Sequence, residues 1–224
     1  MEANKIIITG GATRIGAAIA RKLSGKGVEI VIHYNKSKVK AEKLKKELSI
    51  NGTKVYLIKG DLSVESDVNK IVKFAKSKLK YFDCLINNAS LFENDKLESF
   101  NTDSWGQHLR TNLRTPALLS KEFAKNIKSK NNNIINIIDQ RVFKLTPYFF
   151  SYTISKTGLY TLTKTSAMSL APKIRVNGIA PGPTIKNKRQ SEKHFKKQYM
   201  ATPLKRQVDC LLYTSPSPRD MWTS

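Results

Sequence analysis

The segment KIIITGGATRIG, residues 5–16, decides the fold. Its isoleucines form a short apolar run typical of a buried strand, and a helical pattern begins at Ala17. Between them, Gly10 permits a tight turn and Gly16 lets the helix lie close to the sheet, while main-chain N–H groups at the start of the helix can bind a pyrophosphate. The segment therefore predicts a phosphate-binding loop, although a purely structural glycine turn has the same pattern. Arg14 stands where such loops often have glycine and needs a role of its own.

Apolar runs and helical patterns alternate along the rest of the chain. Strands are predicted at Lys5–Ile8, Val28–His33, Lys54–Ile58, Asp83–Asn87, Ile134–Asp139 and Ile174–Ile179, and helices at Ala17–Lys26, Lys38–Leu48, Glu65–Lys80, Ser104–Ile127 and Tyr152–Ala171. This alternation is typical of a parallel sheet with helices on both faces. The fold class is therefore α/β, a Rossmann-type doubly wound sheet in one domain, whose ligands bind beyond the carboxyl ends of the strands.

The chain has 224 residues and a formal net charge of +23. Its 40 lysine and arginine residues are spread along the sequence without a stripe of basic and aromatic residues, so no nucleic-acid partner is expected. No apolar stretch approaches the roughly 20 residues of a membrane helix, and the first strand leaves no room for a signal peptide. Cys84 and Cys210 form no disulfide framework. We expect a cytoplasmic protein with no membrane partner and no metal site.

Residues 210–224 break the pattern of the preceding sequence. The segment CLLYTSPSPRD, residues 210–220, can be encoded by codons that resemble a sequencing-library adapter. We therefore expect a single domain over residues 1–209, followed by a non-native tail. A natural Ser/Pro-rich tail is the alternative.

The end of the second predicted strand bears on the choice of dinucleotide. A carboxylate about 20 residues after the glycines binds the ribose hydroxyls of NAD. This sequence has Tyr34, Asn35, Lys36 and Ser37 there, and a cation with amides and hydroxyls suits the additional phosphate of NADPH. NADPH is therefore the predicted cofactor, and a lysine on a solvated surface is the alternative.

Tyr152 and Lys156, in YTISK at residues 152–156, fall on one face of a predicted helix. An ammonium beside a phenol lowers the pKa of the phenol, which makes the tyrosine a usable proton donor near neutral pH. The pair alone occurs by chance in many proteins, so its weight comes from the order of the segments around it.

Taken in order, these segments resemble the short-chain dehydrogenase/reductase family from Lys5 to about Gln207. The resemblance rests on TGGATRIG (9–16), DL (61–62), NNAS (87–90), Asn112, YTISK (152–156) and PGPT (181–184). Within the family, the chain is most similar to the pteridine reductase branch, through Arg14, HYNKS (33–37), Ser90, Phe92 and Asp139.

The resemblance implies an NADPH-dependent reductase of a small molecule. In it, Tyr152 donates a proton, Lys156 holds the nicotinamide ribose, and Asn112 holds a water that links Lys156 to solvent. The implied cofactor-binding residues are Gly10, Thr13, Arg14, Ile15, Gly16, Tyr34, Asn35, Lys36, Ser37, Asp61, Leu62, Asn88, Ala89, Ser90, Tyr152, Lys156, Pro181 and Gly182. The implied substrate-binding residues are Arg14, Ser90, Phe92, Asp139 and Tyr152. Residues 185–200 would cover the substrate, a final strand of the family's sheet would be missing, and the parent protein would be a homodimer or homotetramer.

Asp139 bears on the substrate, because most members of the family have a serine there that hydrogen-bonds a carbonyl. A carboxylate repels an oxygen that gains negative charge, but beside a C=N bond it can hold a water or the tyrosine as proton donor. We therefore expect reduction of a dihydropterin- or dihydrofolate-like ring, with Phe92 stacked on it. The alternatives are an aspartate that only caps local N–H groups, a reductase of carbonyls such as 3-oxoacyl thioesters, and a non-catalytic NADPH sensor.

Overall fold

The computed structural model describes residues 4–128, 132–185, 191–201 and 205–206. Its centre is a six-stranded sheet in the order β3-β2-β1-β4-β5-β6, and all neighbouring strands are parallel. The strands are β1 (Lys5–Ile8), β2 (Glu29–Tyr34), β3 (Lys54–Lys59), β4 (Cys84–Asn87), β5 (Asn132–Ile137) and β6 (Ile174–Ile179). The predicted doubly wound parallel sheet is confirmed, and its switch point lies between β1 and β4.

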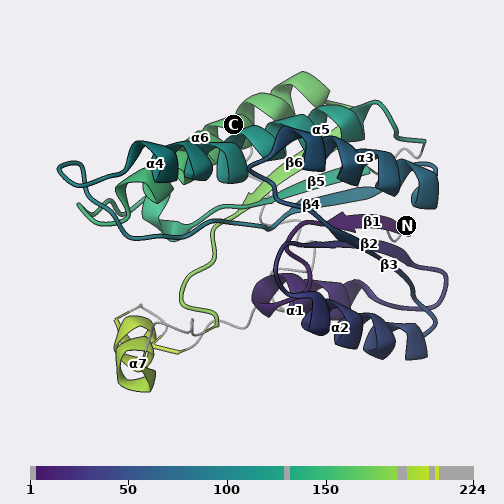
Figure 1. Cartoon of the computed structure of the whole chain (residues 1–224), viewed down its shortest axis with the longest axis horizontal. Coiled ribbons are helices and arrows are strands. Elements are labelled where there is room, and N and C mark those ends of the chain that lie inside the picture. The colour runs from purple at the N-terminus through teal and green to yellow at the C-terminus, as the bar shows by residue number, and fades with distance from the viewer. Residues whose placement is uncertain (1–3, 129–131, 186–190, 202–204, 207–224) are drawn as a thin grey trace.

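Helices cover both faces of the sheet: α1 and α2 lie on one face, and α3, α5 and α6 lie on the other (Figure 1). The helices are α1 (Arg14–Leu23), α2 (Lys38–Ile50), α3 (Glu65–Leu79), α4 (Thr102–Leu109), the π-helical turn η1 (Arg110–Arg114), α5 (Thr115–Ala124), the 3-10 turn η2 (Gln140–Val142), α6 (Phe150–Leu170) and α7 (Glu192–Met200). The first two crossovers pass over one face and the later ones over the other, which produces the three layers.

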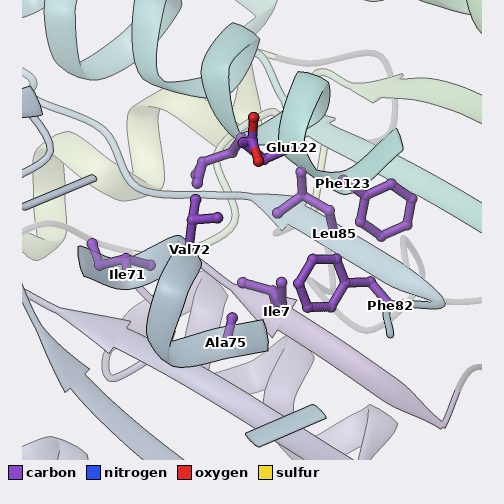
Figure 2. Close-up of a pocket in the computed structure, with 9 residues that line it drawn as sticks. Ile7, Ile71, Val72, Ala75, Phe82, Leu85, Glu122 and Phe123 are labelled. Carbon is purple, nitrogen blue, oxygen red and sulfur yellow. The ribbon is translucent and has the colours of Figure 1, made fainter. Parts of the chain in front are cut away.

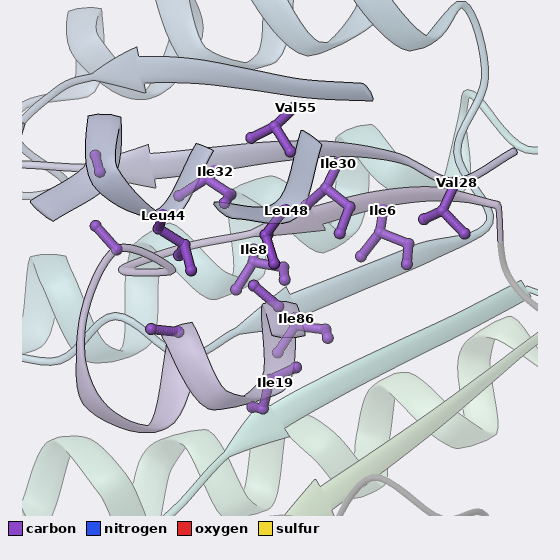
Figure 3. Close-up of a cluster of buried hydrophobic side chains, with 14 of the residues drawn as sticks. Ile6, Ile8, Ile19, Val28, Ile30, Ile32, Leu44, Leu48, Val55 and Ile86 are labelled. Carbon is purple, nitrogen blue, oxygen red and sulfur yellow. The ribbon is translucent and has the colours of Figure 1, made fainter. Parts of the chain in front are cut away.

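The three isoleucines of β1 supply both hydrophobic cores. Ile6 and Ile8 belong to a cluster under α1 and α2 that also contains Leu48 (Figure 3). Ile7 belongs to a second cluster under α3 and α5, where it lies close to Phe82 (Figure 2). Successive side chains of a strand point to opposite faces, so a continuous apolar run is what a strand covered on both sides requires.

A small cavity lies inside the second cluster, between α3, α5 and the sheet (Figure 2). Its walls include Ile7, Ile71 and Phe123, and Glu122 lies at its side. The Glu122 carboxylate is already bound by Lys76 and a second lysine. A binding site needs polar groups that converge on the ligand, so this cavity is a gap in the apolar core rather than a substrate site.

The first helix begins at Arg14 rather than at the predicted Ala17. The predicted start was therefore three residues late, and a glycine of low helix propensity lies within the first turn. In the structure, Gly16 lies in the first turn, where its missing side chain allows close contact with the loop before the helix.

Two other predicted elements are also different in the structure. The predicted helix Ser104–Ile127 is interrupted by η1, because Pro116 has no N–H to donate to the carbonyl of Asn112 four residues earlier. The predicted strand Ile134–Asp139 ends at Ile137, so Asp139 lies beyond the strand and caps the turn η2.

Some sequence predictions fall outside the described residues: the tail at 210–224, and residues 186–190 of the segment predicted to cover the substrate. The helix α7 of that segment stands apart from the three layers, on the side of α1 (Figure 1). Among the helices that the structure describes, none combines the length and the apolar character required to cross a bilayer.

Candidate functional site

The loops after the six strands lie along one edge of the sheet and carry most of the predicted site residues. The parallel register places Ile8 of β1 beside Ile32 of β2 and Ile86 of β4, and Asn87 beside Asn136 of β5. Segments that are far apart in the sequence therefore meet at this edge, as expected for a doubly wound sheet.

The glycine loop forms a close-fitting turn before α1. Gly10 has a φ of +61°, in the left-handed region that favours glycine. A Cβ on Gly16 would lie 2.4 Å from the Gly10 carbonyl oxygen and 2.6 Å from Nδ2 of Asn88. Thr13, the N-cap residue of α1, makes no side-chain cap, and the first turn contains no acid. The N–H groups at this helix end are therefore suited to an anion, and the loop fits a pyrophosphate.

His33 holds the glycine loop in place, a role that the sequence prediction missed. Its Nδ1 accepts a hydrogen bond from Gly10 N at 3.1 Å, and its Nε2 lies 3.0 Å from the carbonyl oxygen of Gly60. Both contacts are satisfied by a neutral imidazole with its proton on Nε2. Burial lowers the pKa of His33 and outweighs the opposite effects of the Gly60 carbonyl, Asp61 and Asp67.

His33→Phe is expected to lower the free energy of unfolding by about 1–3 kcal/mol above pH 7, because the Gly10 N–H loses its buried acceptor. His33 has a pKa below its ordinary value of 6.5, so its stabilisation is present above pH 6.5 and is lost as pH falls further. Urea unfolding at several pH values should therefore show that the difference in the free energy of unfolding between wild type and variant becomes smaller below pH 6.5. A gap that stays constant down to pH 5 would contradict the assigned protonation state.

The predicted cofactor residues Asn88 and Ala89 pack against the same loop. The Asn88 side-chain amide donates to the carbonyls of Thr9 and Gly10 at 2.9 and 3.1 Å. The Thr9 hydroxyl accepts from the main-chain N–H groups of Asn88 and Ala89 at 3.0 and 3.1 Å. Thr9, the first residue of the predicted glycine loop, thus joins the loops after β1 and β4.

The end of β2 lies beside a carboxylate that the sequence prediction did not place there. The Asn35 side chain donates to Oδ2 of Asp61, the residue after β3, at 3.3 Å. The N–H and hydroxyl of Ser63 lower the pKa of Asp61, and exposed Lys36 adds to this effect. A 2′-phosphate at this position would meet Lys36 and Asn35, but also the charge of Asp61.

Some predicted cofactor residues turn their side chains toward the protein interior. Leu62 is buried in the second core cluster, and Ile15 and Tyr34 pack against the first cluster. Any contact of Leu62 with a cofactor would therefore involve its main chain.

Tyr152 lies at the carboxyl edge of the sheet with its hydroxyl bound to a carboxylate. The hydroxyl donates to Oδ2 of Asp139 at 2.7 Å. Burial raises the pKa of Tyr152 well above its ordinary value, Asp139 raises it further, and Arg141 and Ser90 partly oppose this. The sequence predicted that Lys156 lowers this pKa. In the structure the pKa is raised instead, because the effects of burial and Asp139 are the largest.

Lys156 is fully buried one turn further along α6. Its Nζ donates to the carbonyl of Ile137 at 2.7 Å and lies 5.8 Å from the centre of the Tyr152 ring. Burial lowers the pKa of Lys156 to about 8, against a smaller opposing effect of Asp139. The ammonium therefore has one fixed position at the end of β5.

Asn112 joins the loop after β4 to α6. Its side-chain amide donates to the Leu91 carbonyl at 2.9 Å and to Oγ of Ser155 at 3.0 Å, and its Oδ1 accepts from Leu91 N at 2.8 Å. Its side-chain oxygen and nitrogen are therefore both engaged by protein atoms, and Pro116 has no N–H to donate to the main-chain carbonyl of Asn112.

An aromatic stack borders Tyr152. Phe92 and Phe149 are stacked with ring centres 4.4 Å apart, and Phe92 meets Tyr152 edge-on at 4.6 Å. Phe149 has a φ of +59° at the N-cap of α6. Phe149 therefore covers one face of the Phe92 ring, and a substrate ring predicted to stack on Phe92 would have to use the other face.

Arg14 lies between the glycine loop and the segment after β6. Its Nη2 donates to the Ile185 carbonyl at 3.0 Å, and its charge interacts with Tyr152. Pro181 and Gly182 are half-buried in the segment that leads to Ile185. The structure thus brings Arg14, Ser90, Phe92 and Asp139 to one place around Tyr152.

Residues 4–197 match the family model of short chain dehydrogenases. The chain belongs to the short-chain dehydrogenase family. This short-chain dehydrogenase is 28% identical over 184 residues to a 3-oxoacyl-(acyl-carrier-protein) reductase of Synechocystis sp.. The aligned region covers 81% of this chain and 74% of that protein. It is also 32% identical over 185 residues to the uncharacterized oxidoreductase YjdA of Bacillus subtilis. That alignment covers 80% of this chain and 74% of YjdA.

Solved structures include similar proteins with bound cofactor. The structure of FolM alternative dihydrofolate reductase 1 from Brucella canis, complexed with NADP, is 40% identical to this short-chain dehydrogenase. The two structures superpose with a TM-score of 0.88 over 93% of this chain and 83% of that one. A blue fluorescent protein from a metagenomic library, in complex with NADPH, is 25% identical with a TM-score of 0.85 over 92% and 85% of the two chains.

Proposed function

We propose that this short-chain dehydrogenase is an NADPH-dependent reductase of a pteridine, which adds hydride to the carbon and a proton to the nitrogen of a C=N bond. The observation that carries the proposal is the 2.7 Å hydrogen bond from the Tyr152 hydroxyl to Asp139. A carboxylate is unfavourable beside an oxygen that gains negative charge, but compatible with a nitrogen that gains a proton. The similarity to FolM, named as a dihydrofolate reductase and complexed with NADP, supports both the ring and the cofactor.

The residues at the strand ends fit NADPH. The N-terminus of α1 has no acid in its first turn and suits the pyrophosphate. Asn35 and exposed Lys36 offer an amide and an ammonium to the 2′-phosphate, and Lys36 offsets the charge of Asp61. Bound NADPH would supply the hydride.

Tyr152 supplies the proton to the substrate nitrogen. Its raised pKa keeps the hydroxyl protonated at neutral pH but makes it a weaker donor, and Asp139 disfavours the phenolate, so the transfer depends on a cation that stabilises the phenolate. Asp139 orients this hydroxyl, which turns from Oδ2 toward the nitrogen when the proton is transferred. Lys156 is held by the Ile137 carbonyl, and its ammonium stabilises the phenolate that the transfer leaves.

Steady-state NADPH oxidation with a panel of substrates tests this function. We expect kcat/KM for dihydrobiopterin or dihydrofolate to exceed that for an acetoacetyl thioester by about tenfold or more, because the site favours a nitrogen acceptor. Asp139→Asn, which keeps the size of the side chain but removes its charge, should reduce pterin turnover more than thioester turnover. Thermal unfolding of the variant serves as the control for folding.

Other results of these substrate assays would contradict the proposal and favour a different function. Turnover of the thioester alone would favour a carbonyl reductase, the alternative to which the 3-oxoacyl reductase of Synechocystis sp. points. Calorimetric binding of NADPH without turnover of either class would favour a sensor. Equal losses on both substrates in Asp139→Asn would leave Asp139 as a cap of the turn η2, where its Oδ1 accepts from Arg141 N at 2.8 Å.

A further inference from the structure

Arg141 extends the aromatic stack beside Tyr152. Its guanidinium lies 4.5 Å from the centre of the Phe149 ring, and Phe149 is in turn stacked on Phe92. Its Nη1 donates to Oγ1 of Thr146 at 3.1 Å. The side chain is therefore held in a defined position by a cation–π contact and a hydrogen bond.

The surroundings of Tyr152 contain more cationic than anionic side chains. Arg141 and Arg14 both interact electrostatically with Tyr152, from segments that are far apart in the sequence. In the described ranges of the chain, neither arginine forms an ion pair with an aspartate or glutamate. The nearby carboxylate, Asp139, already accepts from Tyr152 and from a main-chain N–H. A negative group on a bound molecule would therefore be favoured here, and a guanidinium can bind a carboxylate through two parallel hydrogen bonds.

A continuous row of side chains connects the guanidinium of Arg141 to the reacting hydroxyl of Tyr152. Tyr152, which donates the proton, meets Phe92 edge-on, Phe149 lies on Phe92, and Arg141 lies over Phe149. A flat ring that reacts at Tyr152 can continue into a second flat group along the phenylalanines, with a carboxylate at Arg141. Residues 143–148, which follow η2, are exposed, so a long tail can extend into solvent there.

We propose that Arg141 determines specificity by binding a carboxylate on the substrate's tail, so that pteridines with an aminobenzoyl-glutamate tail are preferred to pteridines with a short uncharged tail. This inference rests on the proposed function. Arg141 is a binding residue for the tail. Its charge also lowers the pKa of Tyr152, but this effect is common to all substrates and cancels in a ratio of two of them.

Kinetics of Arg141→Gln with two pterins test the inference. Dihydrofolate carries the carboxylated tail and dihydrobiopterin a short uncharged one. The ratio of their kcat/KM values should fall about tenfold in Arg141→Gln, mainly through a higher KM for dihydrofolate; tenfold corresponds to about 1.4 kcal/mol. Arg141→Lys keeps the charge but not the paired donors, and should give an intermediate ratio.

Lys144→Gln is the matched control, because it removes one exposed cation from the same segment. Its ratio should equal that of the wild type. In the wild type, the KM for dihydrofolate should also rise with ionic strength more steeply than the KM for dihydrobiopterin. This second measurement decides the inference if Arg141→Gln lacks a cooperative thermal transition.

A failure of the inference about Arg141 can be distinguished from a failure of the proposed function. An unchanged ratio in a folded Arg141→Gln variant overturns the role of Arg141 while the pterin function stands, and so does an equal dependence of both KM values on ionic strength. If the wild type reduces neither pterin, the proposed function fails, and the inference fails with it.

Discussion

Tyr152→Phe is expected to lower kcat for pterin reduction by about 10²–10⁴-fold, the usual contribution of a positioned proton donor. The change removes the hydroxyl that donates to Asp139 and leaves the ring, which meets Phe92 edge-on, in place. The dissociation constant of NADPH, measured by fluorescence titration, should change by no more than about threefold, since the loss lies in the chemical step.

Tyr160→Phe is the matched control for this result. Tyr160 lies on the same helix, α6, and its ring meets that of Phe143 edge-on. Its variant should keep the wild-type kcat. If Tyr152→Phe instead retained wild-type kcat, the proton donor would have to be another group, and the proposed mechanism would be wrong.

Gly16→Ala is expected to destabilise the protein by about 1–3 kcal/mol and to weaken NADPH binding by tenfold or more. Helix propensity alone favours alanine over glycine by about 0.5–1 kcal/mol. The added Cβ, however, would lie 2.4 Å from the Gly10 carbonyl oxygen and 2.9 Å from Cα of Gly11. Both of these are main-chain atoms, so the glycine loop itself must move, and the clash outweighs the gain in propensity.

Gly25→Ala is the control for the change of residue type, because a Cβ on Gly25 would meet no atom within 4 Å. Urea unfolding and NADPH titration of the two variants separate the effect of the clash from the effect of losing a glycine. We expect Gly25→Ala to be close to wild type in both measurements. A Gly16→Ala variant that matched it would show that the loop has room for a side chain.

The arrangement of strands and helices was largely predictable from the sequence. The isoleucines of β1 and the alternation of apolar runs with helical patterns predicted the parallel sheet, because these patterns reflect local backbone geometry. The bounds were less predictable. Gly16 entered α1 against its propensity, and Pro116 turned one predicted helix into three consecutive segments, α4, η1 and α5.

The residues of the candidate site were predicted as separate segments, without their contacts. Nothing local in the sequence indicated that His33 accepts a hydrogen bond from Gly10, or that Asp61 lies within hydrogen-bonding distance of Asn35. The spacing of Tyr152 and Lys156 on one helix face predicted that Lys156 lowers the pKa of Tyr152, yet burial and Asp139 decide the direction of the shift. A pKa depends on surroundings from several strands, which a linear pattern does not contain.

The sequence by itself thus determined the order of the elements, the glycine loop and the presence of Tyr152 and Lys156 on one helix, since these depend on spacings of a few residues. Only the tertiary structure decided that the Tyr152 hydroxyl faces Asp139, that Phe149 covers Phe92, and that Arg14 reaches Ile185. Apart from the first pair, these residues lie far apart in the chain. Their contacts arise because the parallel register brings the carboxyl ends of all six strands to one edge of the sheet.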